Sequence, residues 1–74
     1  MTLNQLGPGQ TATVKSIQSA DADRRRMLDL GILPGTKIET VIRSPLGDPV
    51  AYRVRDALVA LRREQSELIE VESV

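Results

Sequence analysis

The chain has 74 residues, ten of them basic and ten acidic, and it contains neither cysteine nor histidine. A chain of this length builds one small core, and its zero net charge creates no global field toward nucleic acid or anionic lipid. The composition excludes disulfides and thiolate metal sites, and it removes the commonest metal ligand. We therefore expect a single domain over residues 1–74.

The N-terminal part predicts a helical turn followed by an irregular strand. Residues 2–6 fit one helical turn with Thr2 as its cap, and a Gly-Pro-Gly turn separates it from a strand at 10–18. Within that strand Val14 and Ile17 lie three positions apart, so they cannot share one face of a regular strand. A β-bulge near Lys15 and Ser16 restores a common inner face.

Residues 20–30 predict a helix with a specific stop. Met27 and Leu30 lie three apart on one face, which we expect to turn toward the core. Gly31 follows where a left-handed residue ends a helix, and only glycine adopts that conformation without a Cβ penalty. In this stop motif Ile32 is expected to contact Met27.

Pro34 and Gly35 predict a tight turn, because proline presets φ at the second turn position and glycine accepts a positive φ at the third. The rest of the chain alternates strand patterns with turn residues. We expect strands at 37–43, 49–55, 57–61 and 68–72, a hairpin loop at 44–49 and a helical turn at 62–67.

The strand patterns also predict which side chains share a face. In the strand at 37–43, Ile38, Thr40 and Ile42 share one face, with Lys37, Glu39 and Arg43 opposite. The segment 57–61 is apolar on both faces, which suits a strand covered on both sides, and a short helix is the alternative.

Five short strands and one helix cannot build two well-packed sheets from a chain of this length. One strongly bent sheet curled around a single core solves the problem and hides most strand edges. The expected fold is mainly β: a small SH3-like barrel of about five strands, with one inserted α-helix and a short C-terminal helical turn.

The string Leu30-Gly31-Ile32-Leu33-Pro34-Gly35-Thr36-Lys37-Ile38 closely resembles the signature of the FeoA family of bacterial ferrous iron uptake. Residues 44–50 resemble the family's middle loop, and residues 60–64 with 68–71 resemble its C-terminal end. The resemblance implies an SH3-like fold and a cytoplasmic accessory role. The implied partner is FeoB, the ferrous iron transporter, through its cytoplasmic GTP-binding region.

Similar domains form the C-terminal part of metal-dependent repressors related to the diphtheria toxin repressor. The alternative function is therefore a metal-responsive regulatory or protein-interaction module that binds a transition metal ion. Calorimetry with ferrous or manganous ion separates the two, since tight metal binding favours the sensor.

The chain offers no catalytic constellation and no clear metal site. It has no phosphate-binding glycine loop, and none of its serines has a base partner, so we expect no enzymatic activity and no cofactor. Asp21 with Asp23, or Glu70 with Glu72, could supply oxygen ligands. The simpler interpretation is a helix N-terminus and a solvated strand face. Weak Fe²⁺ binding follows only from the family resemblance.

A protein-binding surface is the remaining option. Leu46 is a large apolar residue at a loop tip. The sequence favours two interpretations equally: Leu46 contacts a partner, or it folds back onto the barrel. Exposed arginines could add complementarity to an acidic partner surface. The candidate interaction residues are Arg24, Arg25, Pro45, Leu46, Asp48, Arg62 and Arg63.

Other partners are less compatible with the sequence. Three consecutive arginines at 24–26 fan over about 200° of a helix, so they form no single patch for nucleic acid. Tyr52 is the one aromatic residue, which leaves no stacking platform for single strands. The chain shows no secretory leader and no apolar run of about 18 residues, so we expect a cytoplasmic protein without membrane insertion. Weak self-association through sheet edges is the remaining alternative.

Overall fold

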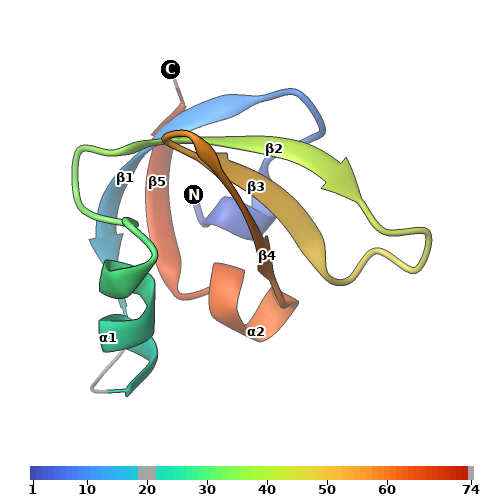
Figure 1. The fold of residues 1–74 in the computed structure, drawn as a ribbon. Coiled ribbons are helices and arrows are strands. Elements are labelled where there is room, and N and C mark those ends of the chain that lie inside the picture. Colours follow the sequence, from blue (N-terminus) through green and yellow to red (C-terminus); the bar gives the residue numbers. More distant parts are fainter. Residues whose placement is uncertain (19–21, 74) are drawn as a thin grey trace.

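The computed structural model describes residues 1–18 and 22–73. A short 3-10 helix opens the chain, and five strands and two α-helices follow (Figure 1). In chain order the elements are η1 (Leu3–Gln5), β1 (Thr11–Ile17), α1 (Ala22–Asp29), β2 (Lys37–Arg43), β3 (Val50–Val54), β4 (Ala57–Leu61), α2 (Arg63–Ser66) and β5 (Ile69–Ser73).

All five strands belong to one antiparallel sheet in the order β4-β3-β2-β1-β5. The sheet bends strongly, so that its two ends come round to the same side, where η1 and α2 lie (Figure 1). This curling confirms the expected mainly β fold. It follows from a sheet too small to bury its inner face against a second sheet.

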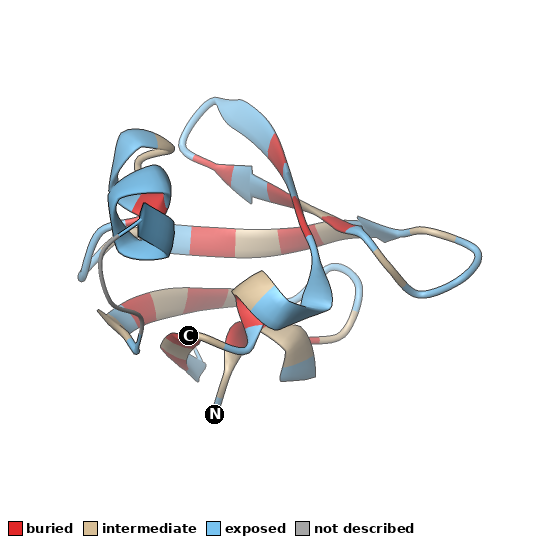
Figure 2. Cartoon of the chain, turned by 90° about the horizontal axis from the view of Figure 1, so that it is seen from below, coloured by how far each residue is buried: buried red, intermediate tan, exposed pale blue. Residues whose placement is uncertain are grey.

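The core lies inside the curl, and buried residues alternate with exposed ones along the strands (Figure 2). Tyr52 on β3 is its largest side chain and is 0% exposed. The other apolar core residues come from the strands, from η1 and α1, and from the segments that follow these two helices: Leu3, Leu6, Ala12, Val14, Met27, Ile32, Ile38, Val50, Val54, Val59, Leu61, Ile69 and Val71.

The bulge expected in the first strand is confirmed. Val14 pairs with Val71 and Ser16 pairs with Glu70, so the register shifts and Lys15 is the extra residue. Val14 is thereby buried, and Ile17 packs against the core from the other side of the bulge. An added residue in one strand reverses the alternation, which reconciles the three-residue spacing with one inner face.

The helix stop is also confirmed. The Ile32 N–H donates to the Met27 carbonyl at 2.9 Å and the Gly31 N–H donates to the Leu28 carbonyl at 3.0 Å. Gly31 has φ +88°, the left-handed conformation that this motif requires. Met27 and Ile32 are buried, and Leu30 is partly buried against the same core.

The turn after the helix positions the second strand. The Thr36 N–H donates to the Leu33 carbonyl at 2.9 Å, which closes the turn around Pro34 and Gly35. The Gly35 N–H donates to the Val14 carbonyl at 2.8 Å. This hydrogen bond attaches the turn to β1 directly before β2 begins.

Thr2 is the N-cap residue of the first helical turn, as expected, although its side chain makes no capping hydrogen bond. Its hydroxyl bonds to Asn4 instead, and the Gln5 Oε1 accepts the Thr2 N–H at 2.8 Å. The expected turn forms, but a glutamine one turn later supplies the side-chain hydrogen bond.

The prediction that Ile42 shares a face with Ile38 and Thr40 is wrong. Thr40 pairs with Tyr52 and Ile42 with Ala51, so Val41 is an extra residue in β2. This second bulge turns Ile42 outward, and its side chain is 64% exposed.

The segment Ala57–Leu61 is a strand, so the helix alternative is wrong. The expectation that it is covered on both sides is wrong as well. It forms the edge strand β4, and Leu58 on its outer face is 63% exposed. The apolar composition of residues 57–61 indicates a strand, but it does not determine whether that strand lies at the centre or at the edge of the sheet.

Candidate interaction site at the β2–β3 loop

A closed turn holds Leu46 away from the protein. The Gly47 N–H donates to the Ser44 carbonyl at 2.8 Å, with Pro45 at the second position of the turn and Gly47 at φ +83°. Leu46 is 94% exposed, so it does not fold back onto the barrel. Proline fixes φ at its own position, and Gly47, two positions later, accepts a conformation that other residues resist. The apolar tip is therefore displayed by a short, hydrogen-bonded loop.

The same loop is fastened to α2. The Asp48 Oδ1 accepts the backbone N–H of Arg63 at 2.9 Å, at the first residue of α2. The Gln65 Oε1 accepts the Arg62 N–H at 3.0 Å, which satisfies a second donor at this helix start. Free N–H groups at a helix start need such acceptors, so the loop and the helix position each other. The structure thereby brings five of the predicted residues together: Pro45, Leu46, Asp48, Arg62 and Arg63.

A cavity of about 200 Å³ lies between the loop, α2 and η1. Its lining is mostly polar and consists of Asn4, Arg43, Gly47, Asp48, Val50, Arg63 and Ser66. Arg43 lines the cavity beside η1. The Arg43 Nη2 donates to the Leu6 carbonyl at 2.6 Å and to the Asn4 carbonyl at 3.3 Å. Asn4, Arg43 and Ser66 were not predicted as site residues. Their proximity depends on how the sheet curls, and no local pattern encodes it.

Arg62 and Arg63, at the start of α2, differ in how far their charge is compensated. The Arg63 Nε lies 3.0 Å from the Glu67 Oε1, in an exposed pair one helical turn apart. Within residues 1–18 and 22–73, Arg62 makes no ion pair. A partner carboxylate can thus bind Arg62 without displacing a carboxylate of this chain.

Tyr52 lies close to the residues that line this cavity. Burial raises the pKa of Tyr52 above its ordinary value of 10.0, while the neighbouring Ser66 hydroxyl and the Arg43 charge act in the opposite direction. The Tyr52 hydroxyl forms no well-aligned hydrogen bond with any described residue. The neutral form of Tyr52 is therefore the one that suits the folded protein.

This raised pKa predicts a loss of stability in alkali. Because the folded-state pKa exceeds the unfolded-state value, the contribution of neutral Tyr52 is complete below pH 10 and is lost as the pH rises through the raised pKa. The free energy of unfolding of the wild type, minus that of Tyr52→Phe, should be constant at neutral pH and fall above about pH 10. A difference that stays constant through pH 12 would contradict this assignment.

The other two predicted arginines lie elsewhere. Arg24 and Arg25 are exposed on α1, at the opposite end of the molecule from the β2–β3 loop (Figures 1 and 2). They cannot belong to one contiguous surface with Leu46. The seven candidate residues therefore lie in two separate regions of the molecule.

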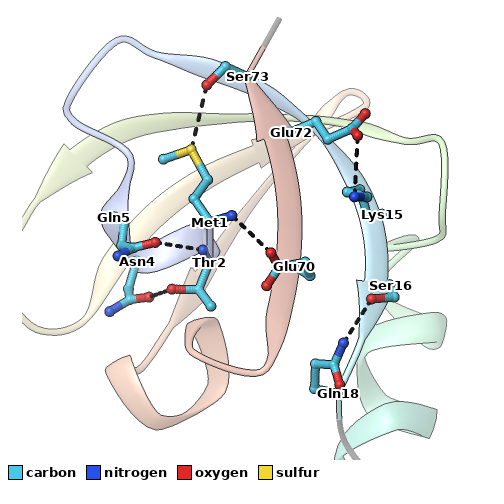
Figure 3. A network of polar contacts seen from close by, with 10 residues as sticks. All are labelled: Met1, Thr2, Asn4, Gln5, Lys15, Ser16, Gln18, Glu70, Glu72 and Ser73. Atoms are coloured by element: carbon cyan, nitrogen blue, oxygen red, sulfur yellow. Dashed lines mark hydrogen bonds and ion pairs between the residues drawn. The ribbon is translucent and has the colours of Figure 1, made fainter.

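The acidic residues of β5 are engaged in separate ion pairs (Figure 3). The Met1 amino nitrogen lies 2.8 Å from the Glu70 Oε1, and the Lys15 Nζ lies 3.3 Å from the Glu72 Oε1. In the described part of the chain, no three acidic side chains gather as a metal site would require. Asp21 lies outside the described residues, and so does its predicted pairing with Asp23.

No helix within residues 1–18 and 22–73 is both long and apolar enough to cross a bilayer.

The comparisons with known proteins agree on one family. The FeoA domain family matches residues 1–73. A fusion protein of Fe(2+) transport protein A and Fe(2+) transporter FeoB from Porphyromonas gingivalis is 39% identical over 74 residues. The alignment covers 100% of this chain and 9% of the fusion protein, so the chain spans less than a tenth of that relative.

Solved structures show the same fold. The solution structure of iron(II) transport protein A from Clostridium thermocellum is 35% identical, with a TM-score of 0.96, and the match covers 100% of this chain and 46% of that one. The zinc complex of FeoA from Stenotrophomonas maltophilia, described as a prokaryotic SH3 domain protein, is 32% identical with a TM-score of 0.87. That match covers 97% of this chain and 89% of that one. The curled five-stranded sheet is therefore an SH3-like domain, and the chain belongs to the FeoA domain family.

Proposed function

We propose that this domain is a non-enzymatic accessory of ferrous iron transport that docks on the cytoplasmic part of FeoB. The relative in which the two proteins form one polypeptide supports the pairing, because fusion keeps two chains at high local concentration. The proposed contact is the corner formed by the β2–β3 loop and α2.

The exposure of Leu46 carries this proposal. A leucine that is 94% exposed on a hydrogen-bonded turn gains free energy when a partner covers it, and the turn is already ordered before binding. Asp48 of the same loop binds the backbone of Arg63 at the start of α2, and the exposed Arg62 and Arg63 can pair with carboxylates of the partner. The partner surface that fits this corner has an apolar recess bordered by acidic side chains.

A domain of this kind acts by binding one conformation of its partner better than another. The free energy available is the difference in affinity between the two states, and no bond-making step is required of this chain. The described residues of the corner include no nucleophile beside a base, so the chemistry of nucleotide hydrolysis belongs to FeoB in this proposal.

The direct test is a functional one. GTP turnover and ferrous iron uptake by FeoB are measured with and without this protein, at several concentrations of it. The proposal predicts a saturable change in at least one of the two rates, with the same midpoint as binding measured separately. No change in either rate, together with no binding, would remove it.

Leu46→Glu should weaken docking on FeoB about tenfold or more, since truncating or charging a central apolar contact typically costs over 1 kcal/mol. The melting temperature should not change, because the side chain is 94% exposed. Leu28→Glu makes the same chemical change on α1, on the far side of the molecule, and should leave docking intact (Figure 1). Equal losses for both variants would show that the corner is not the docking surface.

A further inference from the structure

Strand β4 has a free edge in the described structure. Val54 and Ala57 pair across a two-residue turn, so they exchange both hydrogen bonds, and the regular register continues to Val50 and Leu61. Ala57, Val59 and Leu61 therefore direct their backbone groups toward β3, while Leu58 and Ala60 direct theirs away from the sheet. No loop or side-chain hydrogen bond within residues 1–18 and 22–73 reaches the backbone of Leu58 or Ala60.

This edge lacks the usual protection. Its sequence, Ala57-Leu58-Val59-Ala60-Leu61, contains no charge and no proline, and its pairing with β3 shows no bulge. Edge strands ordinarily carry one of these features, which prevent another chain from pairing with them. Leu58 is 63% exposed, so the edge presents an apolar side chain as well as free backbone groups.

On the outer face of the sheet, the apolar surface extends from the β4 edge across β3 to β2. Ile42 on β2 pairs with Ala51 on β3, and Ala51 pairs with Ala60 on β4. These three residues form a row across the sheet, and Leu58 lies next to its outer end on the same face. A strand added at β4 would extend this face and cover part of Leu58.

The charges at the two ends of β4 make the edge complementary to itself. When two copies pair antiparallel about Val59, Leu58 of one lies opposite Ala60 of the other, and Asp56 lies opposite Arg62. Neither Asp56 nor Arg62 makes an ion pair within the described residues, so both are available. Two pairs of opposite charge then flank the apolar centre, one at each end.

We propose that this domain forms a two-fold dimer in which the β4 strands of two copies pair antiparallel and join their sheets. Leu58 and Ala60 of both copies exchange four backbone hydrogen bonds, and each Leu58 packs beside Ala60 of the second copy. Such an interface is isologous, so it closes at two copies and does not extend into a filament. The interface is short, and the dimer dissociates reversibly at low concentration.

The first test is sedimentation of the purified chain, which requires no FeoB and is therefore independent of the proposed function. From about 10 µM to 1 mM, a range chosen for a small and weak interface, the apparent mass should rise from 8.1 kDa toward twice that value. Leu58→Lys places a charge on the edge and should raise the dimer dissociation constant about tenfold or more, with an unchanged melting temperature. A chain that stays monomeric to 1 mM, or a dimer that Leu58→Lys does not affect, would overturn the proposal.

A charge exchange tests the register. Asp56→Arg and Arg62→Asp should each weaken the dimer about threefold to tenfold, and the double variant should restore most of the affinity. The control is Lys15→Glu, a charge reversal on β1, which should have no effect on dimerisation. A double variant as weak as either single one would show that these residues do not face each other. Association with an extended strand of another protein, but never with a second copy, would also contradict the proposal.

Discussion

Tyr52→Ala is expected to lower the free energy of unfolding by about 3–5 kcal/mol, the range measured for removing a large aromatic side chain from a core. Tyr52 is 0% exposed and is the largest fully buried side chain. It lies in the core on β3, where Tyr52 pairs with Thr40 of β2 on one side and with Val59 of β4 on the other. A domain of this length is stable by only about 4–11 kcal/mol, so one substitution removes a large share.

Urea denaturation at pH 7 measures this effect, and Tyr52→Phe is the matched control. Phenylalanine keeps the ring and removes a hydroxyl that makes no well-aligned hydrogen bond, so its free energy of unfolding should stay within about 1 kcal/mol of the wild type. If Tyr52→Phe were as destabilising as Tyr52→Ala, the hydroxyl would be forming an essential bond. The packing account would then be wrong.

Gly31→Val is expected to destabilise the fold by about 2–3 kcal/mol, because a β-branched residue is strained at positive φ. Gly31 has φ +88° and ends α1 through the hydrogen bonds that it and Ile32 donate. A Cβ at this position would lie 3.9 Å from the Val54 Cγ1, an ordinary contact distance, so the Cβ itself fits and the main strain arises in the backbone. Relaxing that strain would pull Met27 and Ile32 out of the core.

Thermal unfolding with Gly31→Asn as the comparison separates the two causes. Asparagine tolerates the left-handed conformation better than other non-glycine residues, so it should cost only about 1 kcal/mol. The expected order of stability is glycine, then asparagine, then valine. Equal stability of the asparagine and valine variants would indicate that the backbone conformation is not the cause.

The features predicted well from the sequence are those encoded by neighbouring residues. The helix stop at Gly31 and the turn at Pro34 and Gly35 require backbone conformations that few residues adopt. The bulge at Lys15 was predictable because the spacing of Val14 and Ile17 conflicts with a regular strand. In each case the local sequence admits one conformation.

The features that were missed depend on the whole sheet. Nothing in the alternation at 37–43 reveals the extra residue at Val41, and without it Ile42 is assigned to the same face as Ile38 and Thr40. The segment 57–61 has the composition of a buried strand, yet it forms the edge because no strand of the described chain remains to cover it. Bulges and edges depend on pairing partners, which a single segment does not specify.

The candidate site combines both kinds of information. The turn residues around Leu46 are visible in the sequence. The structure shows that the Leu46 side chain is exposed and does not fold back onto the barrel. Asp48 and Arg63 are 15 positions apart, and only the tertiary fold shows that they bond to each other. The same fold separates Arg24 and Arg25 from this corner by the width of the molecule (Figure 1).

One measurement tests the central claim most directly. The isotope-labelled chain is titrated with the unlabelled cytoplasmic part of FeoB, and backbone amide shifts are followed by nuclear magnetic resonance. We expect the largest changes at Leu46, Gly47, Arg63 and Ser66, with none at Arg24 or Arg25. Changes confined to α1, or no changes at saturating partner, would contradict an account in which this small domain works by presenting the β2–β3 corner to the transporter.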